Sequence, residues 1–237
     1  MPKYPDGYDV GATPLAEFRA EPTRGAVLCF APHPDDEVIG PGGVLAQHAA
    51  RGDRVRVVLA TDGTAGDPDG RFGSSDAFRA QRRRESVAGL TALGVADVAF
   101  WGYPDGCVVT AEDVEGIARR AVEELDAFGP ATVYLPWSGE GHSDHRALFA
   151  GVCRALDRVG FAGEALGYEV WTAMDPDVVI DITPAADRKR AAIRCYATQL
   201  AYVDYEHVIF GLNAYRSLSF QAGRGFAEAF ERIGGTR

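Results

Sequence analysis

The chain has 237 residues, of which 46% are hydrophobic and 24% are charged, enough to bury a sizeable core in one α/β domain. Acidic side chains outnumber basic ones by 34 to 24, and the net charge of −10 excludes a basic footprint, so we expect no nucleic-acid partner. No apolar stretch is long enough to cross a membrane, and the first residues, MPKYPDGYDVGATP, lack the pattern of a secretory signal. These features predict a cytoplasmic protein without a membrane partner.

Several common catalytic templates are absent from the sequence. Its two lysines, Lys3 and Lys189, do not lie in a GxxxxGK[ST] phosphate loop, and neither GxSxG nor HExxH occurs. The cysteines form no CxxC pair and are too sparse for a disulfide scaffold, so we expect reduced, mostly buried thiols. They are Cys29, Cys107, Cys153 and Cys195.

Residues 1–24 are rich in proline, glycine and charge, which predicts an N-terminal arm, followed by a single domain over residues 25–237. In this domain apolar β-prone runs alternate with helical patterns. We expect strands at residues 26–31, 55–60, 98–101, 132–135, 165–171 and 178–182. We expect helices at residues 38–51, 75–93, 112–128, 145–159 and 184–199. This alternation predicts an α/β fold with a mostly parallel sheet covered by helices on both faces.

Polar residues gather where the first four expected strands end, and open α/β sheets bind ligands at the carboxyl ends of their strands. The segments there are PHPDDE, TDGTAGD, GYPDG and PWSGEGHSDH. Three of the five histidines, His33, His142 and His145, lie at two of these strand ends together with several acidic residues. The sequence therefore predicts a site at this edge of the sheet.

A catalytic zinc site needs three protein ligands and an open position for water, and His33, Asp36 and His145 supply such a set. Asp35 is then free to take a proton from the water as a general base. His142, three residues before His145, is placed to stabilise an oxyanion. Asp144 is a candidate to orient His142 or His145. Together these residues predict attack of metal-activated water on a carbonyl carbon.

Each of these motifs also has a purely structural interpretation. Paired acids after a strand often cap the next helix, Asp105 in GYPDG fits a tight turn, and Arg82 with Glu85 fits a solvated helix face. The aromatic residues of the segment 199–220 wall a sugar pocket or simply pack in the core, and His48 is expected to be structural. The presence of both His/Asp clusters at strand ends favours the metal site.

The segment APHPDDEVIGPGGVLA resembles the LmbE-like, or PIG-L, superfamily of zinc-dependent N-acetylglucosaminyl deacetylases. The resemblance continues through TDGTAG, RRRESVAGLTALGV, GYPDG and PWSGEGHSDHRAL, over residues 26–148. Further on it is carried by VIDIT, Lys189, YATQ and FAEAF, where Thr198 and Phe226 replace the family's commoner Ser and Tyr.

The resemblance implies a Rossmann-like three-layer fold and hydrolysis of the N-acetyl group of an N-acetylglucosamine-type sugar or glycoside to acetate and an amine. It also implies a role for each matching residue. These are zinc ligands at His33, Asp36 and His145, a general base at Asp35, an oxyanion-stabilising acid at His142, an orienting carboxylate at Asp144, and substrate contacts at Arg82 and Asp105.

We therefore expect one Zn²⁺ per chain, with Fe²⁺ or Co²⁺ suited to the same ligands, and a small amino-sugar substrate. A homo-oligomer is compatible with the sequence. The aglycone is not readable from it, and the glycine-rich loop 62–76 is a candidate lid. The alternatives are a thiol-conjugate amidase, another metal hydrolase such as a phosphoesterase, and a catalytically inactive carbohydrate-binding module. A nucleotide-dependent enzyme is disfavoured by the missing phosphate motifs.

Overall fold

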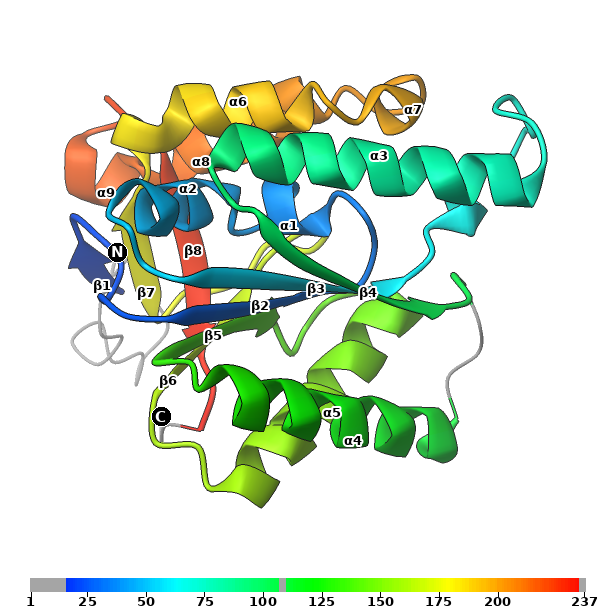
Figure 1. Cartoon of the computed structure of the whole chain (residues 1–237). Coiled ribbons are helices and arrows are strands. Elements are labelled where there is room, and N and C mark those ends of the chain that lie inside the picture. Colours follow the sequence, from blue (N-terminus) through cyan, green and yellow to red (C-terminus); the bar gives the residue numbers. More distant parts are fainter. Residues whose placement is uncertain (1–15, 107–109, 235–237) are drawn as a thin grey trace, which may run out of the picture.

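The strands form one sheet in the order β1-β7-β8-β6-β5-β2-β3-β4 in the computed structural model, which describes residues 16–106 and 110–234. The central strands β6, β5, β2, β3 and β4 run parallel, β8 is antiparallel to both of its neighbours, and β1 pairs parallel with β7. The predicted mostly parallel sheet is confirmed (Figure 1). The bounds are β1 (Glu17–Arg19), β2 (Val27–Ala31), β3 (Val55–Thr61), β4 (Asp97–Tyr103), β5 (Thr132–Pro136), β6 (Glu164–Tyr168), β7 (Val178–Asp181) and β8 (Ala227–Arg232).

Helices cover both faces of the sheet, as the three-layer prediction requires. Figure 1 shows α1, α2, α3, α6 and α8 on one face and α4 with α5 on the other. The helices are α1 (Asp36–Ile39), α2 (Gly42–Ala50), α3 (Ser75–Leu93), α4 (Ala111–Phe128), α5 (Ser143–Val159), α6 (Ala186–Ile193), α7 (Ala197–Leu200), α8 (Tyr205–Arg216) and α9 (Leu218–Gln221), with short 3-10 turns η1 (Thr64–Gly66) and η2 (Thr183–Ala185). No helix of the described residues is long and apolar enough to cross a membrane.

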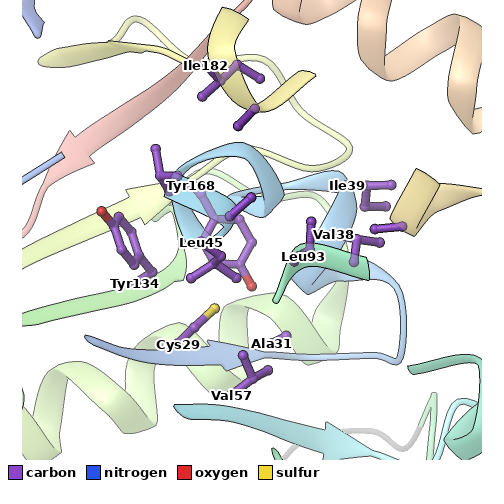
Figure 2. Close-up of a cluster of buried hydrophobic side chains, with 14 of the residues drawn as sticks. Cys29, Ala31, Val38, Ile39, Leu45, Val57, Leu93, Tyr134, Tyr168 and Ile182 are labelled. Carbon is purple, nitrogen blue, oxygen red and sulfur yellow. The ribbon is translucent and has the colours of Figure 1, made fainter. Parts of the chain in front are cut away.

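The uninterrupted apolar sequence of β2 follows from burial on both faces. Side chains alternate across a strand, so Val27, Cys29 and Ala31 join the core beneath α1, α2, α3 and α6, while Leu28 and Phe30 join the core beneath α4 and α5. Figure 2 shows the first of these cores, in which the labelled side chains of the sheet meet those of α1, α2 and α3.

The single helix predicted at residues 38–51 is wrong, because the chain turns at Gly40–Pro41 and forms α1 and α2 instead. The N-terminus of α2 is capped by a side chain of β8, a strand that is distant in the sequence. The carboxylate of Glu228 on β8 accepts hydrogen bonds from the backbone N–H groups of Gly43 (2.6 Å) and Val44 (2.9 Å). Lys189 of α6 donates to the same carboxylate at 2.7 Å. This buried ion pair keeps Glu228 in position at the start of α2.

The C-terminal part differs most from the expectation. The helix predicted at 184–199 is divided into α6 and α7, and the strand predicted at 165–171 ends at Tyr168. Helix α8 and strand β8 were not predicted at all. In the arm predicted at residues 1–24, residues 16–24 are described and contribute the edge strand β1, while residues 1–15 lie outside the described residues.

The order of the parallel strands determines where a site can form. From β2 the chain proceeds to β3 and β4 on one side, whereas β5 lies on the other side of β2 and leads to β6. Loops leaving β2 and β5 therefore diverge at their carboxyl ends and leave a crevice, which is the usual ligand position in open α/β sheets. The two His/Asp clusters of the sequence follow these two strands.

Candidate metal centre and active site

The turn after β2 brings three predicted site residues to the crevice. The backbone N–H of His33 donates to Asp36 Oδ2 at 2.9 Å, which closes the turn. Asp35 has a φ of 130°, a conformation that residues other than glycine rarely adopt. It precedes α1 without forming a side-chain cap, so the helix-capping interpretation of Asp35 is wrong.

Helix α5 places the second cluster opposite this turn. His142 is its N-cap residue, and its Nδ1 accepts the backbone N–H of Asp144 at 3.2 Å. Because Nδ1 is the acceptor, the neutral ring carries its proton on Nε2. Burial lowers the pKa of His142, and the neighbouring His33 and His145 add to this effect, which favours the neutral form.

Three ligand atoms converge between the two clusters. His33 Nδ1 and Asp36 Oδ2 are 3.0 Å apart, and His145 Nε2 lies 3.3 Å from each of them. Ligands about 2.0–2.1 Å from a tetrahedral ion are separated by roughly 3.3–3.4 Å, so the three atoms have the spacing of one face of such a site. Burial would raise the pKa of Asp36, but His145 and His33 lower it below its usual range, so this side chain stays ionised.

The contacts of His33 Nε2 determine the tautomer of this ring. His33 Nε2 lies 3.1 Å from Asp144 Oδ2 and 3.2 Å from Asp105 Oδ1. A proton on Nε2 satisfies both carboxylates and leaves the lone pair of Nδ1 toward Asp36 and His145. We expected Asp144 to orient His142 or His145; its carboxylate contacts His33 instead, and only its backbone N–H reaches His142.

The partner of His145, Glu140, was not predicted from the sequence. His145 Nδ1 lies 3.5 Å from Glu140 Oε2, and both side chains are buried. Glu140 also accepts the backbone N–H groups of Val170 (2.7 Å) and Trp171 (3.1 Å), in the loop after β6. The signal was available, because Glu140 lies in the same strand-end segment SGEGHSDH as the histidines.

Asp35 has the electrostatics of a general base. Burial raises its pKa to about 6, although the Arg82 guanidinium opposes this shift. Arg82 donates to Asp35 Oδ2 at 3.2 Å and to the carbonyl of Pro34. Both Arg82 and Glu85 are buried, 2% and 3% exposed, so the interpretation of this pair as a solvated helix face is wrong.

A buried pair behind the turn supports Asp35 and was also missed. Glu37 Oε2 accepts the backbone N–H of Asp35 at 2.9 Å, and Glu37 Oε1 accepts the hydroxyl of Tyr196. No local sequence pattern connects Glu37 with Tyr196, since they are separated by 159 positions.

Most of the predicted site residues line a hollow of about 170 Å³ at the carboxyl edge of the sheet, whereas Asp144 and His145 are not among its lining residues. Asp105 is brought here from the end of β4, and its Oδ2 accepts the backbone N–H of Ala65 at 2.9 Å. In the aromatic segment, Tyr205 lines the hollow, whereas Phe210 packs in the core and Tyr215 is exposed. The lining residues are His33, Asp35, Asp36, Ala65, Gly66, Arg82, Asp105, His142, Trp171, Gln199 and Tyr205.

Two further sets of ligand atoms lie within 4.8 Å of one another among the described residues. One combines His33 with His142 and His145, and the other combines His33 with Asp105 and Asp144. In the second set Asp144 Oδ2 already accepts the N–H of Gly106 at 2.9 Å as well as facing His33. Asp105 and Asp144 are therefore both engaged as hydrogen-bond acceptors.

His48 was predicted to be structural, and the cysteines were predicted to be reduced and mostly buried. His48 is buried between Asp53 and Tyr134, away from the hollow, as expected for a structural histidine. Of the described cysteines, which are all free, Cys29 is buried while Cys153 and Cys195 are partly exposed. Cys107 lies outside the described residues.

The fold and the site together define an α/β protein with a cluster of His and Asp side chains that could hold a metal ion at the switch point of its sheet. Residues 28–156 match the PIG-L family, described as GlcNAc-PI de-N-acetylase. Because this match covers more than half of the 237 residues, the chain belongs to the PIG-L family.

Curated relatives point in the same direction. The probable N-acetyl-alpha-D-glucosaminyl L-malate deacetylase 2 of Bacillus subtilis is 30% identical over 185 residues, covering 73% of this chain and 82% of that protein. The 1D-myo-inositol 2-acetamido-2-deoxy-alpha-D-glucopyranoside deacetylase of Kineococcus radiotolerans is 31% identical over 159 residues, covering 55% of this chain and 44% of that protein.

Solved structures agree on the fold. The N,N'-diacetylchitobiose deacetylase of Pyrococcus horikoshii superimposes with a TM-score of 0.70 at 25% identity, over 88% of this chain and 83% of that one. A 4-carboxy-2-hydroxymuconate hydratase from Pseudomonas putida superimposes with a TM-score of 0.73 at 22% identity, over 91% of this chain and 98% of that one. Since proteins with such different names share the fold, the function must be argued from the site.

Proposed function

We propose that this protein is a metal-dependent hydrolase that removes the N-acetyl group of an N-acetylglucosamine-type sugar or glycoside. The observation that carries the proposal is the meeting of His33 Nδ1, Asp36 Oδ2 and His145 Nε2 at 3.0–3.3 Å, beside Asp35 and His142 on one hollow. A ligand set, a base and a hydrogen-bond donor in one hollow are the parts that amide hydrolysis needs.

The donor set fits Zn²⁺, and also suits Fe²⁺ or Co²⁺. His33, Asp36 and His145 would hold the ion, and Asp144 with Glu140 would orient the two rings from behind. When bound, the ion supplies Lewis-acid polarisation of the amide carbonyl and lowers the pKa of water. We propose one ion per chain, because Asp105 and Asp144 already accept hydrogen bonds elsewhere.

Asp35 transfers the proton, and His142 stabilises the negative charge on the oxygen. As water adds to the amide carbon, the carboxylate of Asp35 takes its proton, and its pKa of about 6 keeps it largely ionised near neutral pH. His142 presents Nε2–H to the carbonyl oxygen, where negative charge develops. When the C–N bond breaks, Asp35 returns the proton to the amine nitrogen, and the products are acetate and a free amino sugar.

Arg82 and Asp105 are the proposed substrate contacts at the wall of the hollow. Arg82 is held by Asp35 and Pro34, so its contact with substrate is coupled to the position of the base. The relatives named above act, by their names, on acetylated glucosaminyl derivatives of malate, inositol and chitobiose, which supports an amino-sugar derivative as the substrate.

The alternatives are less well supported by the geometry. A carbohydrate-binding module has no use for a base and a neutral histidine donor beside three candidate ligand atoms. A two-metal phosphoesterase needs a second set of free carboxylates, and those near His33 are engaged.

The test is acetate release from N-acetylglucosamine and its malate, inositol and chitobiose derivatives, with metal-loaded protein and a chelated control. Release that disappears on chelation and returns when Zn²⁺ is added back supports the proposal. Release from none of these substrates by protein that holds about one ion per chain would refute it.

A further inference from the structure

Trp171 is a large apolar side chain that stays exposed at the rim of the hollow. Its side chain lines the hollow but is 53% exposed, and its ring centroid lies 5.8 Å from that of Tyr205. An exposed aromatic ring at the rim of a hollow is informative, because ligand sites are lined largely by apolar and aromatic side chains.

The loop that carries Trp171 is held in place by two buried carboxylates. Glu140 accepts the backbone N–H groups of Val170 at 2.7 Å and Trp171 at 3.1 Å. Glu169 accepts the backbone N–H of Met174 at 3.0 Å and pairs with Arg216 at 2.6 Å. The indole is therefore presented by an ordered loop, and Glu140 connects that loop to the proposed metal ligand His145.

The size of the hollow places the aglycone next to this indole. Its volume of about 170 Å³ is below the roughly 300–1,000 Å³ of pockets that enclose a whole small ligand. The acetamido group and its own sugar ring fill such a space, so whatever the sugar carries must lie at the rim. The C–H-rich face of a second ring can pack there on the indole.

The charges of the hollow select against an anionic aglycone. Of the described lining residues, Arg82 is the one arginine or lysine; it is only 2% exposed, away from the rim, and its Nη2 faces Asp35. The carboxylates of Asp35, Asp36 and Asp105 face the same space. A carboxylate or phosphate on the aglycone would be repelled by these three carboxylates, whereas a neutral ring would meet no charge penalty.

We propose that Trp171 is a specificity-determining residue that stacks on a neutral ring attached to the reacting N-acetylated sugar, so that the preferred substrates are neutral two-ring glycosides. The inference rests on the proposed function and adds the class of the aglycone. A second sugar and a cyclitol both supply such a ring, and the substrates below distinguish them.

The experiment compares kcat/KM for acetate release from four compounds: N-acetylglucosamine, N,N'-diacetylchitobiose, N-acetylglucosaminyl-inositol and N-acetylglucosaminyl-malate. Wild-type protein should prefer at least one of the two neutral two-ring substrates over the monosaccharide, and the malate glycoside should be no better than the monosaccharide. Trp171→Ala should lower kcat/KM for the preferred two-ring substrate roughly five- to tenfold and lower that for the monosaccharide clearly less.

Two variants serve as controls. Trp171→Phe keeps an aromatic face and should restore most of the two-ring preference. Tyr215→Ala removes an aromatic side chain that is 64% exposed on α8 and does not line the hollow, and it should behave as wild type. An equal loss on all substrates in Trp171→Ala, no loss on any, or a preference for the malate glycoside would overturn the inference.

Failure of the proposed function is recognised separately, as absence of acetate from all four compounds with metal-loaded wild type. In that case calorimetric titration with N,N'-diacetylchitobiose decides the inference. Binding that weakens roughly five- to tenfold in Trp171→Ala supports stacking on Trp171, and equal or absent binding in both proteins overturns it.

Discussion

The buried carboxyl group of Glu37 accepts the backbone N–H of Asp35, two residues earlier, at 2.9 Å. The donor N–H belongs to Asp35 itself, whose φ of 130° is unfavourable for residues that carry a side chain. The other oxygen of Glu37 accepts the hydroxyl of Tyr196, which is fully buried. The pair therefore stabilises the backbone conformation that presents Asp35 to the hollow.

Tyr196→Phe tests this support with the smallest change, because it deletes one hydroxyl and keeps the ring in its packed position. We expect kcat to fall about tenfold or more while KM and metal content stay near wild type, since small displacements of a reacting group cost up to about 100-fold in rate. Steady-state kinetics and metal analysis provide the measurement. An unchanged kcat would show that Asp35 does not need the pair, and loss of the metal would mean a general distortion of the turn.

Asp35→Asn separates the base from the ligands. Asparagine has nearly the size and shape of aspartate, so the turn should persist, and the metal should stay at about one ion per chain. We expect kcat to fall about 10²–10⁴-fold, because no group remains to take the proton. His145→Ala, in contrast, should lose both metal and turnover. Loss of the ion in Asp35→Asn would contradict the assignment of Asp35 as a base and not a ligand.

The ion pair of Lys189 with Glu228 should be important for stability. Both side chains are buried, and Lys189→Met would leave a charged Glu228 in the core beside the α2 N-terminus. We expect the free energy of unfolding in urea to fall by roughly 3–5 kcal/mol. Arg194→Met is the matched control, since Arg194 pairs with Glu206 while 62% exposed, and it should cost no more than about 1 kcal/mol. Equal effects of the two substitutions would contradict the prediction.

His48 should make the protein less stable in mild acid. Burial lowers its pKa, and Asp53 only partly opposes this shift. The unfolded chain then binds the proton at higher pH than the folded one, so stability is complete above the unfolded pKa of about 6.5 and declines as the pH falls below it.

Urea unfolding at about pH 7.5 and about pH 5.5 measures this contribution. His48→Gln should show a smaller decline over this interval than wild type. The control His207→Gln changes an exposed histidine and should keep the wild-type decline. If His48→Gln declined as steeply as wild type, His48 would not be the group responsible.

The part of the fold that the sequence predicts well is the part with strong local signals. Helix α3 has its predicted bounds, because Ser74 caps its start and Gly94 ends it, and β2 is an unbroken apolar run. The break between α1 and α2 was missed because its cap, Glu228, lies 185 positions from Gly43. Strand β8 was missed because its pairing with β6 and β7 is visible only once the sheet has formed.

The site shows the same division between local and distant information. The members His33, Asp35, Asp36 and the cluster at His142–His145 could be predicted because they follow two strands of a parallel sheet. Their orienting partners could not, since a contact such as Asp144 with His33 spans 111 positions and depends on the order of β2 and β5. Trp171 joins the hollow only through the loop that Glu140 holds.

We propose that the donor set of His33, Asp36 and His145 serves amide hydrolysis of an N-acetylated amino sugar. The most direct measurement is the time course of acetate release from N,N'-diacetylchitobiose and N-acetylglucosamine by protein whose metal content has been determined. We predict release that requires about one ion per chain, is abolished by chelation and is lost in His145→Ala. Release that persists unchanged in His145→Ala or in the chelated protein would contradict the account.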